Sequence, residues 1–370
     1  MLFVPNNFPG WCQQPLNLAV IMKLLVLSGI LSDYGNSLAN AFQRLGYEVK
    51  CCEYLKPEKG VKGIWRRSIL GRLGFYTEKK NIQKYFKEVL EIITKFRPEG
   101  IVVVTGQRRD FFSDVITSFI ERVGKRPKLA IWYIDQLKYT PAKPLSRSFF
   151  DRWFVYEPTD VPIMKKEWGI EAIVLPMAFD PACYHPIDKN KAIPELIPDI
   201  SFIGSVAYEK RKNILEHLSK NALENGLNFK IISDSFRFPL FYLKDQPNLR
   251  KVLEFGHADH KRNNMIYNIS KINLNIHGPW AIEAMNTRFF EILGSCGLQI
   301  VERFKSQAQL GFCPDKDFLV YSGIGELREK VNFVLANPDK ARVIAQSGHK
   351  KVKNHSWLSR AKIIQEQTFS

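Results

Sequence analysis

Short apolar segments of strand length alternate with amphipathic helix patterns along this chain, and the alternation runs through it twice. In the first run, KLLVLSG at 23–29 and GIVVVTG at 100–106 are continuous apolar segments with a helix pattern at 79–96 between them. A segment with three prolines at 184–198 interrupts the alternation, and DISFIGS at 199–205 starts it again. Because fully apolar strands joined through helices are typical of parallel sheets covered on both faces, the sequence predicts an α/β fold with two Rossmann-like, doubly wound domains.

The break between the two runs divides the chain into four expected segments. Residues 1–21 form a peripheral extension, 22–184 an N-terminal domain, 185–198 a linker and 199–370 a C-terminal domain. A chain of 370 residues is longer than one hydrophobic core usually supports, which also favours two domains. Ligands of open parallel sheets bind beyond the carboxyl ends of the strands, so we expect the functional site in the cleft between the domains.

The remaining elements are expected from the same periodicities. Strands are predicted at 47–54, 128–135, 153–158, 172–180, 228–233, 271–277, 298–302 and 318–322. Helices are predicted at 37–45, 111–123, 209–225, 261–270, 286–294, 324–336 and 356–367, and we expect the last of them to pack back toward the N-terminal domain.

Composition argues against several other classes of protein. Hydrophobic residues make up 45% of the chain and charged residues 25%, which is a globular composition. No apolar run reaches the roughly 18–20 residues that span a bilayer, and the first 21 residues lack the basic segment that opens a signal peptide. The six cysteines form no CxxC pair and no Cys/His ligand spacing, so no zinc site is expected. Reduced cysteines and the missing signal favour the cytoplasm.

The net charge of +17 is concentrated early in the chain, where residues 51–150 carry 21 Lys and Arg against 10 Asp and Glu. The densest part, 56–80, places apolar residues at near-helical spacing beside Arg66, Arg67 and Arg72. Such a segment suits an interfacial helix on anionic lipid, and it would also suit a DNA backbone. We therefore expect an anionic partner, with peripheral association at the inner membrane surface ahead of nucleic acid. The alternative is a solvated basic face.

The first turn of the second domain, FIGSVAYEKR at 202–211, has the features of an anion site. Gly204 and Ser205 end the strand, and a helix starting near Tyr208 would carry Lys210 and Arg211 in its first turn. Free N–H groups and the helix dipole favour an anion at that point, and a glycine permits close approach of a diphosphate. The alternative is an ordinary loop with solvated cations.

The segment AIEAMNTRFFEILGSCG at 281–297 holds two glutamates eight positions apart. Asn286 is the expected N-cap of a helix, with Glu291 on its first turn, Glu283 in the loop before it, and His277 at the end of the preceding strand. Two carboxylates presented to the cleft can accept hydrogen bonds from sugar hydroxyl groups. The alternative is one capping glutamate and one solvated glutamate.

The pair Glu283-x7-Glu291 matches the EX7E pattern of retaining GT-B glycosyltransferases. The text NTRFFEILGSCGLQIVE at 286–302 resembles more closely the CgeB-like, spore-maturation-type glycosyltransferases, and the resemblance covers about 128–365. Other segments that resemble the same group are FIGS with Arg211, KINLNIH at 271–277, AIWYIDQ at 130–136, FFDRWFVYEPTD at 149–160, VLPMAFDPACYHP at 174–186 and GHKKVKNHSWLSRAKII at 348–364. In one departure, Trp280, Ala281 and Ile282 precede Glu283 where the pattern has a glycine-rich loop.

The resemblance implies a GT-B fold and a nucleotide-sugar donor. It implies that Glu291 holds the ribose hydroxyls, that Glu283 holds the donor sugar, and that Arg211 with Lys210 neutralises the diphosphate. Arg288 and His277 would lie nearby. The implied donor-binding set is Glu291, Arg288, Gly204, Ser205, Lys210, Arg211 and Asn286, and the implied catalytic set is Glu283, Asp135 and His277.

The chemistry of glycosyl transfer is compatible with these residues. Negative charge grows on the departing diphosphate, and helix N-termini with Arg and Lys can stabilise it. The chain has no DxD motif of the kind that a metal-dependent site would use, so we expect no metal and no cofactor beyond the donor. The EX7E pattern favours retention of the anomeric configuration. Inversion would need a general base, for which Asp135 is the candidate, and its alternative is a structural aspartate at a strand end.

The function expected from the sequence is a glycosyltransferase that moves a sugar from a nucleotide sugar to a cell-envelope or glycan acceptor, lipid-linked or otherwise anionic. Three alternatives stay open at this point: a glycosyltransferase that modifies DNA bases, a nucleotide-sugar epimerase, and a two-lobed binding protein without catalysis.

Overall fold

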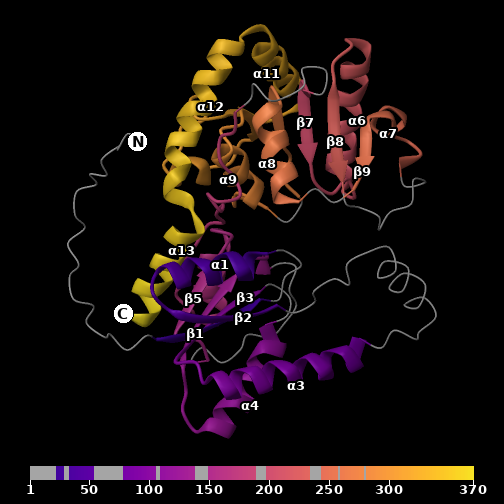
Figure 1. Ribbon diagram of the computed structural model, residues 1–370. Helices are drawn as coiled ribbons and strands as arrows, with labels where there is room; N and C mark the ends of the chain where they lie inside the picture. Colours follow the sequence, from indigo (N-terminus) through magenta and orange to yellow (C-terminus); the bar gives the residue numbers. More distant parts are fainter. Residues whose placement is uncertain are drawn as a thin grey trace, which may run out of the picture.

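The chain folds into two α/β domains, which lie one above the other in Figure 1. The computed structural model describes residues 22–28, 33–53, 78–105, 109–137, 149–188, 197–233, 243–256, 259–278 and 281–370. Each domain is built on a six-stranded parallel sheet with helices on its faces, which confirms the predicted fold class.

The N-terminal sheet has the strand order β2-β1-β3-β4-β5-β6. Its strands are β1 (Lys23–Ser28), β2 (Glu48–Glu53), β3 (Gly100–Thr105), β4 (Lys128–Tyr133), β5 (Arg152–Val155) and β6 (Ala172–Val174). All six residues of β3 are buried, because helices cover both faces of the sheet. Neighbouring residues of β1 show this directly, since Leu24 packs in one core cluster and Leu25 in the other.

The helices of the first domain lie on opposite sides of this sheet (Figure 1). On one face lies α1 (Tyr34–Arg44), and on the other lie α3 (Glu78–Phe96) and α4 (Arg109–Val123). The short α5 (Asp160–Ile163) and the turn η2 (Met164–Trp168) connect β5 to β6.

The C-terminal sheet has the order β12-β11-β10-β7-β8-β9. Its strands are β7 (Ile200–Ile203), β8 (Phe229–Ser233), β9 (Leu253–Phe255), β10 (Ile272–Asn275), β11 (Gln299–Glu302) and β12 (Leu319–Tyr321). The chain runs outward from β7 in one direction and from β10 in the other, so the topological switch point lies between these two strands. Ligands of such sheets bind beyond the carboxyl ends of the strands at the switch point.

The connections of the second domain are mostly helical. They are α6 (Glu209–Glu224), α7 (Pro247–Val252), α8 (His260–Ile269), α9 (Thr287–Gly294), α10 (Ser306–Gln309), α11 (Ile324–Ala336) and α12 (Pro338–Val352).

The end of the chain returns to the first domain through η6 (Lys353–His355), α13 (Trp357–Ile364) and η7 (Gln365–Phe369). The ring of Trp357 lies 5.5 Å from that of Tyr34 and 5.7 Å from that of Trp132. The buried Arg360 donates hydrogen bonds to the carbonyl oxygens of Pro176 and Met177 at 2.7 and 2.9 Å. The expected packing of the last helix against the N-terminal domain is therefore confirmed.

Three parts of the secondary-structure prediction need correction. The strand predicted at 172–180 ends at Val174, shortly before Pro176, which has no N–H to donate to a sheet. The edge strand β9 and the helix α12 were not predicted. Gly348 lowers the helix propensity within α12, yet it is needed there because a Cβ would collide with the carbonyl oxygen of Asp317.

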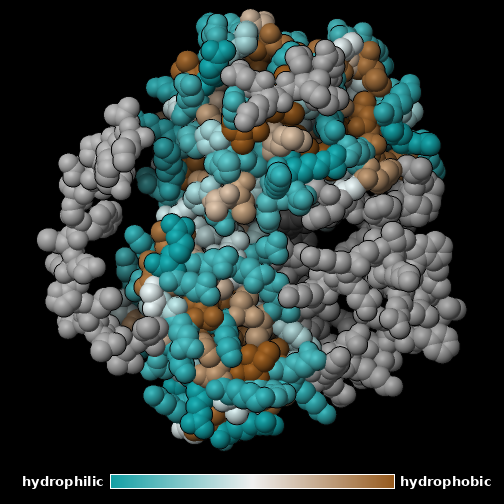
Figure 2. Space-filling model, viewed as in Figure 1, coloured by the Kyte–Doolittle hydropathy of each residue, from teal (hydrophilic) through white to brown (hydrophobic). Residues whose placement is uncertain are grey.

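Several predictions lie outside the described residues. They are the extension 1–21, most of the basic segment 56–80 with Arg66, Arg67 and Arg72, and the linker residues 189–196. Where the surface is described, hydrophilic residues cover most of the face in Figure 2, with apolar residues between them. The large apolar side chains with the greatest exposure belong to several elements of both domains.

Candidate active site

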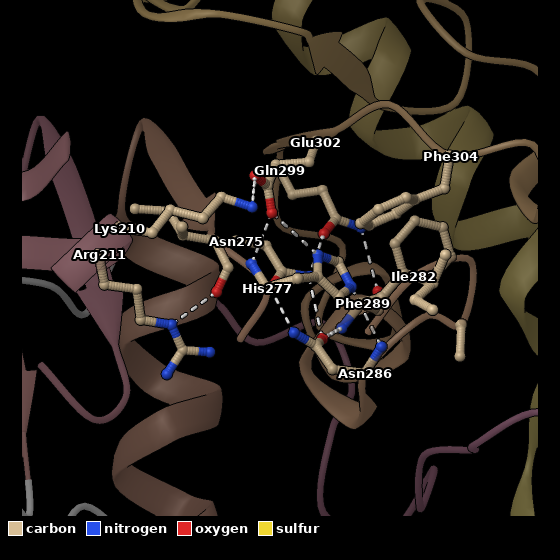
Figure 3. A network of polar contacts seen from close by, with 12 residues as sticks. Lys210, Arg211, Asn275, His277, Ile282, Asn286, Phe289, Gln299, Glu302 and Phe304 are labelled. Atoms are coloured by element: carbon tan, nitrogen blue, oxygen red, sulfur yellow. Dashed lines mark hydrogen bonds and ion pairs between the residues drawn. The ribbon is translucent and has the colours of Figure 1, made fainter. Parts of the chain in front are cut away.

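The loop between β7 and α6 meets the loop after β10 at the switch point of the second sheet (Figure 3). Tyr208 is the N-cap of α6, and the helix begins at Glu209, as predicted. Tyr208 makes no side-chain capping bond, and the first N–H groups of a helix have no partner within it. This helix end can therefore receive an anion.

Arg211 joins the ends of the two switch-point strands. Its Nε donates to the carbonyl oxygen of Ile276 at 2.9 Å, and its Nη1 donates to that of Ser205 at 3.0 Å. The side chain is buried against the rings of Phe202 and Tyr208. Burial lowers the pKa of Arg211 to about 10, and the charge of Arg288 acts in the same direction. The guanidinium is thus a fixed cation at neutral pH.

Lys210 is the exposed neighbour of this fixed cation. Its Nζ forms an ion pair with Oε1 of Glu302, at the end of β11, and its side chain is 48% exposed. The other carboxylate oxygen of Glu302 accepts the backbone N–H of His277 at 2.9 Å. Glu302 is therefore held in place by the backbone at His277, whereas the exposed Lys210 can leave Glu302 and bind another anion (Figure 3).

The imidazole of His277 has no exposed surface. Its Nε2 accepts the backbone N–H of Asn286 at 3.2 Å, so the neutral ring carries its proton on Nδ1, which lies 3.8 Å from Oε2 of Glu302. Burial holds the pKa of His277 well below its usual value, and the charges of Arg211, Lys210 and Arg288 lower it further. The neutral His277 thus supports the loop. Neither of its ring nitrogens is exposed in this structure, and its catalytic role stays a prediction.

Asn286 is the N-cap of α9, as predicted. Its Oδ1 accepts the N–H of Phe289 at 3.0 Å, and its side chain forms a reciprocal amide pair with Asn275. Gln299 extends this network and donates to the carbonyl oxygen of Phe289 at 3.1 Å (Figure 3). The side chain of Asn286, predicted to bind the donor, is used here to fix the start of α9.

Arg288 brings a third cation to the switch point. It is the second residue of α9, and its guanidinium lies against Gly204, where a Cβ would be 3.2 Å from its Cζ. Arg288 acts electrostatically on Arg211 and His277. The predicted residues Gly204, Ser205, Lys210, Arg211 and Arg288 therefore do come together in one cationic cluster.

Glu291 lies on the second turn of α9, since it is the fifth residue of the helix, which corrects the predicted first-turn position. Burial raises its pKa, while Arg288, His260 and the hydroxyl of Tyr184 lower it. The Tyr184 hydroxyl also lies 2.8 Å from Nδ1 of His260, whose Nε2 is 3.2 Å from Oδ2 of Asp33. A chain of polar contacts thus runs from Glu291 to Asp33 of the first domain, and no sequence pattern predicts these contacts.

Glu283 is held in its loop from both ends. Its carboxylate accepts the N–H groups of Lys305 and Ser306, at the start of α10, at 2.7 and 3.3 Å. Its carbonyl oxygen accepts the hydroxyl of Ser306. This arrangement is the capping alternative that the sequence left open, and contact with a donor sugar stays a prediction.

Asp135 lies two residues beyond β4, at the carboxyl edge of the first sheet. It is partly buried, and burial raises its pKa. It acts electrostatically on Tyr156, whose hydroxyl donates to the carbonyl oxygen of Ala284 at 3.4 Å. Asp135 is therefore close to the loop that carries Glu283.

Three further features concern the described ranges alone. Within them, no three Cys, His, Asp or Glu side chains are grouped to hold a metal ion, and no helix there is both long and apolar enough to cross a bilayer. The cysteines described there, Cys51, Cys52, Cys183, Cys296 and Cys313, form no disulfide with one another.

Residues 210–366, which include most of the second domain, match the sequence model of a family described as glycosyl transferase-like. No curated protein matches the chain. Among solved structures, it is similar to the Anabaena protein HepE in complex with UDP-glucose, with a TM-score of 0.65 and 12% identity over 93% of this chain and 98% of that one. It is also similar to sucrose-phosphate synthase from Thermosynechococcus elongatus, with a TM-score of 0.63, 13% identity and the same coverages. A glycosyltransferase from Rickettsia africae gives 0.61 and 14% over 94% and 99%.

Proposed function

We propose that this chain, a glycosyltransferase with the GT-B fold, transfers a sugar from a nucleotide-diphosphate sugar to a glycan or cell-envelope acceptor. The observation that carries the proposal is the cationic cluster of Lys210, Arg211 and Arg288 at the switch point of the second sheet. A diphosphate placed there would meet these side chains and the uncapped start of α6.

The reaction breaks the bond between the anomeric carbon and the diphosphate, forms a bond to an acceptor oxygen, and releases the proton of the acceptor hydroxyl. Charge grows on the leaving phosphate, so donors fixed before the reaction contribute most. Arg211 is fixed by two backbone carbonyls, and Lys210 would move from Glu302 to the phosphate. In this proposal the cations stabilise the leaving group and no metal ion is required.

Glu291 is assigned to the ribose hydroxyls. It lies three residues after Arg288 on α9, so the two side chains lie on the same face of the helix. Tyr184 would yield its place at Glu291 to the ribose. We further assign this chain to the CgeB-like group, on its resemblance at 286–302.

The stereochemical proposal is retention, on the Glu283-x7-Glu291 pattern. Inversion would instead use Asp135 as the general base, and its raised pKa suits that task better than that of an exposed aspartate. The configuration of the isolated product, read from the coupling of its anomeric proton, decides between them.

The acceptor side is proposed from charge. The net charge of +17 favours an anionic or lipid-linked acceptor, and a cytoplasmic enzyme at the membrane surface would meet one. An epimerase would convert the donor with no acceptor present, so the acceptor-free reaction separates the two functions.

The donor site is tested by thermal stabilisation with nucleoside diphosphates and nucleotide sugars, for the wild type beside Glu291→Ala. A ligand at 100 times its Kd adds about 2.7 kcal/mol to the free energy of unfolding. We expect one nucleotide to stabilise the wild type and to lose most of that effect in Glu291→Ala, while inorganic pyrophosphate stabilises both equally because it has no ribose.

Glu224→Ala is the matched control, since Glu224 pairs only with Lys220 at the exposed end of α6 among the contacts described. It should respond to nucleotides as the wild type does. Absence of stabilisation by every nucleotide would refute the donor site. Addition of EDTA should leave the nucleotide response unchanged.

A further inference from the structure

Glu157 is a fully buried carboxylate just beyond β5, and most of its partners belong to the other domain. Its Oε2 accepts the N–H groups of Ile282 and Ala284 at 3.1 and 3.2 Å. The N–H of Glu283 lies 3.2 Å from both carboxylate oxygens. Within its own domain, Oε1 accepts the N–H and the hydroxyl of Thr159 at 3.3 and 3.0 Å.

Three successive backbone N–H groups therefore converge on one carboxylate, an arrangement that binds anions strongly. A buried carboxylate is costly unless donors surround it, and here the second domain supplies three of them. Separation of the domains would return both Glu157 and the three N–H groups to water. The contact is thus made only when the domains are together.

The loop bound by Glu157 leads directly into the site residues. The same three residues include Glu283, and the chain then passes through Asn286 to Arg288 on α9. Tyr156, beside Glu157, donates to the carbonyl oxygen of Ala284. The first domain therefore binds this loop through two residues: Glu157 accepts its N–H groups, and Tyr156 donates to one of its carbonyl oxygens.

We propose that Glu157 is a positioning residue that holds the two domains together at the site. Its carboxylate binds the N–H groups of residues 282–284 when the domains meet, a contact that we call the clasp, and so positions Glu283, the residue assigned to the donor sugar. The part of this proposal that concerns the donor depends on the function proposed above. The clasp itself does not, and it is tested by a measurement that needs no substrate.

The clasp requires a carboxylate of this length. Glu157→Gln would place an NH2 group against N–H donors, so at most one oxygen can still accept. Glu157→Asp keeps the charge but shortens the side chain by one methylene, so the carboxylate lies farther from the N–H groups of residues 282–284. Glu167→Gln is the matched control, because Glu167 is an exposed residue of η2 in the same segment.

The experiment is hydrogen exchange of the full chain, followed by mass spectrometry on peptides that contain 282–284. We expect these amides to exchange at least tenfold faster in Glu157→Gln, and as in the wild type in Glu167→Gln. Peptides of β10 and β11 should keep their wild-type rates. If Glu157→Gln does not fold, Glu157→Asp should show the same local acceleration at a smaller size.

Unchanged exchange at 282–284 would overturn the proposal. So would an acceleration spread evenly over both domains, since that would mark Glu157 as a general stabiliser. Two further measurements separate positioning from binding. The Kd of Glu157→Gln for UDP should stay within threefold of the wild-type value. The kcat of this variant with the best-bound nucleotide sugar should fall at least tenfold below the wild-type value, with KM nearly constant. Failure of the wild type to bind UDP or any other nucleotide would count against the proposed function and would leave the exchange result to decide the clasp.

Discussion

The two domains contribute different charged side chains near their junction. The second domain contributes Lys210, Arg211 and Arg288, of which Arg211 is held by backbone carbonyls of its own domain. The first domain contributes carboxylates beyond the ends of β4 and β5, Asp135 and Glu157, and most of the N–H groups that Glu157 accepts belong to the second domain. The position of Arg211 is thus set within the second domain alone, whereas Glu157 gains most of its hydrogen-bond partners only when the domains meet. This division suits a reaction in which one domain holds a leaving anion and the other completes the site.

Burial has different consequences on the two sides, although its physical effect is the same. It favours the neutral form of any ionisable group. It lowers the pKa of Arg211 only to about 10, so this cation keeps its charge at neutral pH. It raises the pKa of Asp160, which begins α5 beside Glu157, to about 6. The acidic side is therefore the one that responds to pH near neutrality.

The largest effect that we predict is the pH dependence of stability due to Asp160. Unfolded aspartate releases its proton near 3.8 and native Asp160 near 6, so the native state binds more protons between these values. The free energy of unfolding must then fall as pH rises through this window. Two pKa units correspond to about 3 kcal/mol. Asp160→Asn keeps an oxygen for the Leu137 N–H, which donates to Asp160 at 3.1 Å, and should remove most of this fall.

Urea unfolding at pH 4, 5, 6 and 7 measures the difference between the variant and the wild type. The exposed Asp339→Asn, on α12, is the control and should follow the wild type at each pH. Parallel curves for Asp160→Asn and the wild type would contradict the assigned pKa.

On the cationic side, Arg211→Met should weaken nucleoside diphosphate binding about 100-fold, or about 2.7 kcal/mol. The variant loses a fixed charge and leaves two carbonyl oxygens, of Ile276 and Ser205, without this donor. Arg211→Lys keeps the charge but lacks the planar guanidinium that binds both carbonyl oxygens, so its affinity for nucleoside diphosphates should fall about tenfold. Titration calorimetry on folded protein, with the exposed Arg250→Met as control, measures both. Equal binding by Arg211→Met and the wild type would remove Arg211 from the site.

The same two sides differ in how much of them the sequence predicts. The residues of the cationic side lie close together in the sequence. Gly204 to Arg211 belong to one strand-to-helix connection, and Asn286 is the N-cap of α9, which carries Arg288. Strand, cap and charge patterns suffice there. The detail they miss on this helix is Glu291, which was predicted on the first turn and lies on the second.

The acidic side depends on contacts between residues far apart in the chain. Glu157 binds Ile282, 125 positions away, and Tyr184 binds His260, 76 positions away. Both residues lie in segments that resemble the CgeB-like group, but the resemblance assigns them no role, and their roles follow from how the domains pack. The same applies to Gly348, which breaks the helix pattern of α12 because α12 packs tightly on the backbone at Asp317. Periodicity reports the faces of single elements, so it predicts the sheets well and the junction between domains poorly.

The smallest effect concerns the contact between the two loops of the cationic side. In Gly204→Ala the new Cβ would lie 3.2 Å from Cζ of Arg288, so the guanidinium must shift by a few tenths of an ångström. We expect nucleoside diphosphate binding to weaken about fivefold, or roughly 1 kcal/mol. Gly325→Ala is the control, because a Cβ on Gly325, in α11, meets no other atom within 4 Å. Alanine there should leave binding unchanged and stabilise the helix slightly. If Gly204→Ala binds as the wild type does, Arg288 can shift away from the new Cβ without loss of affinity, and close packing between these two loops is not needed for binding.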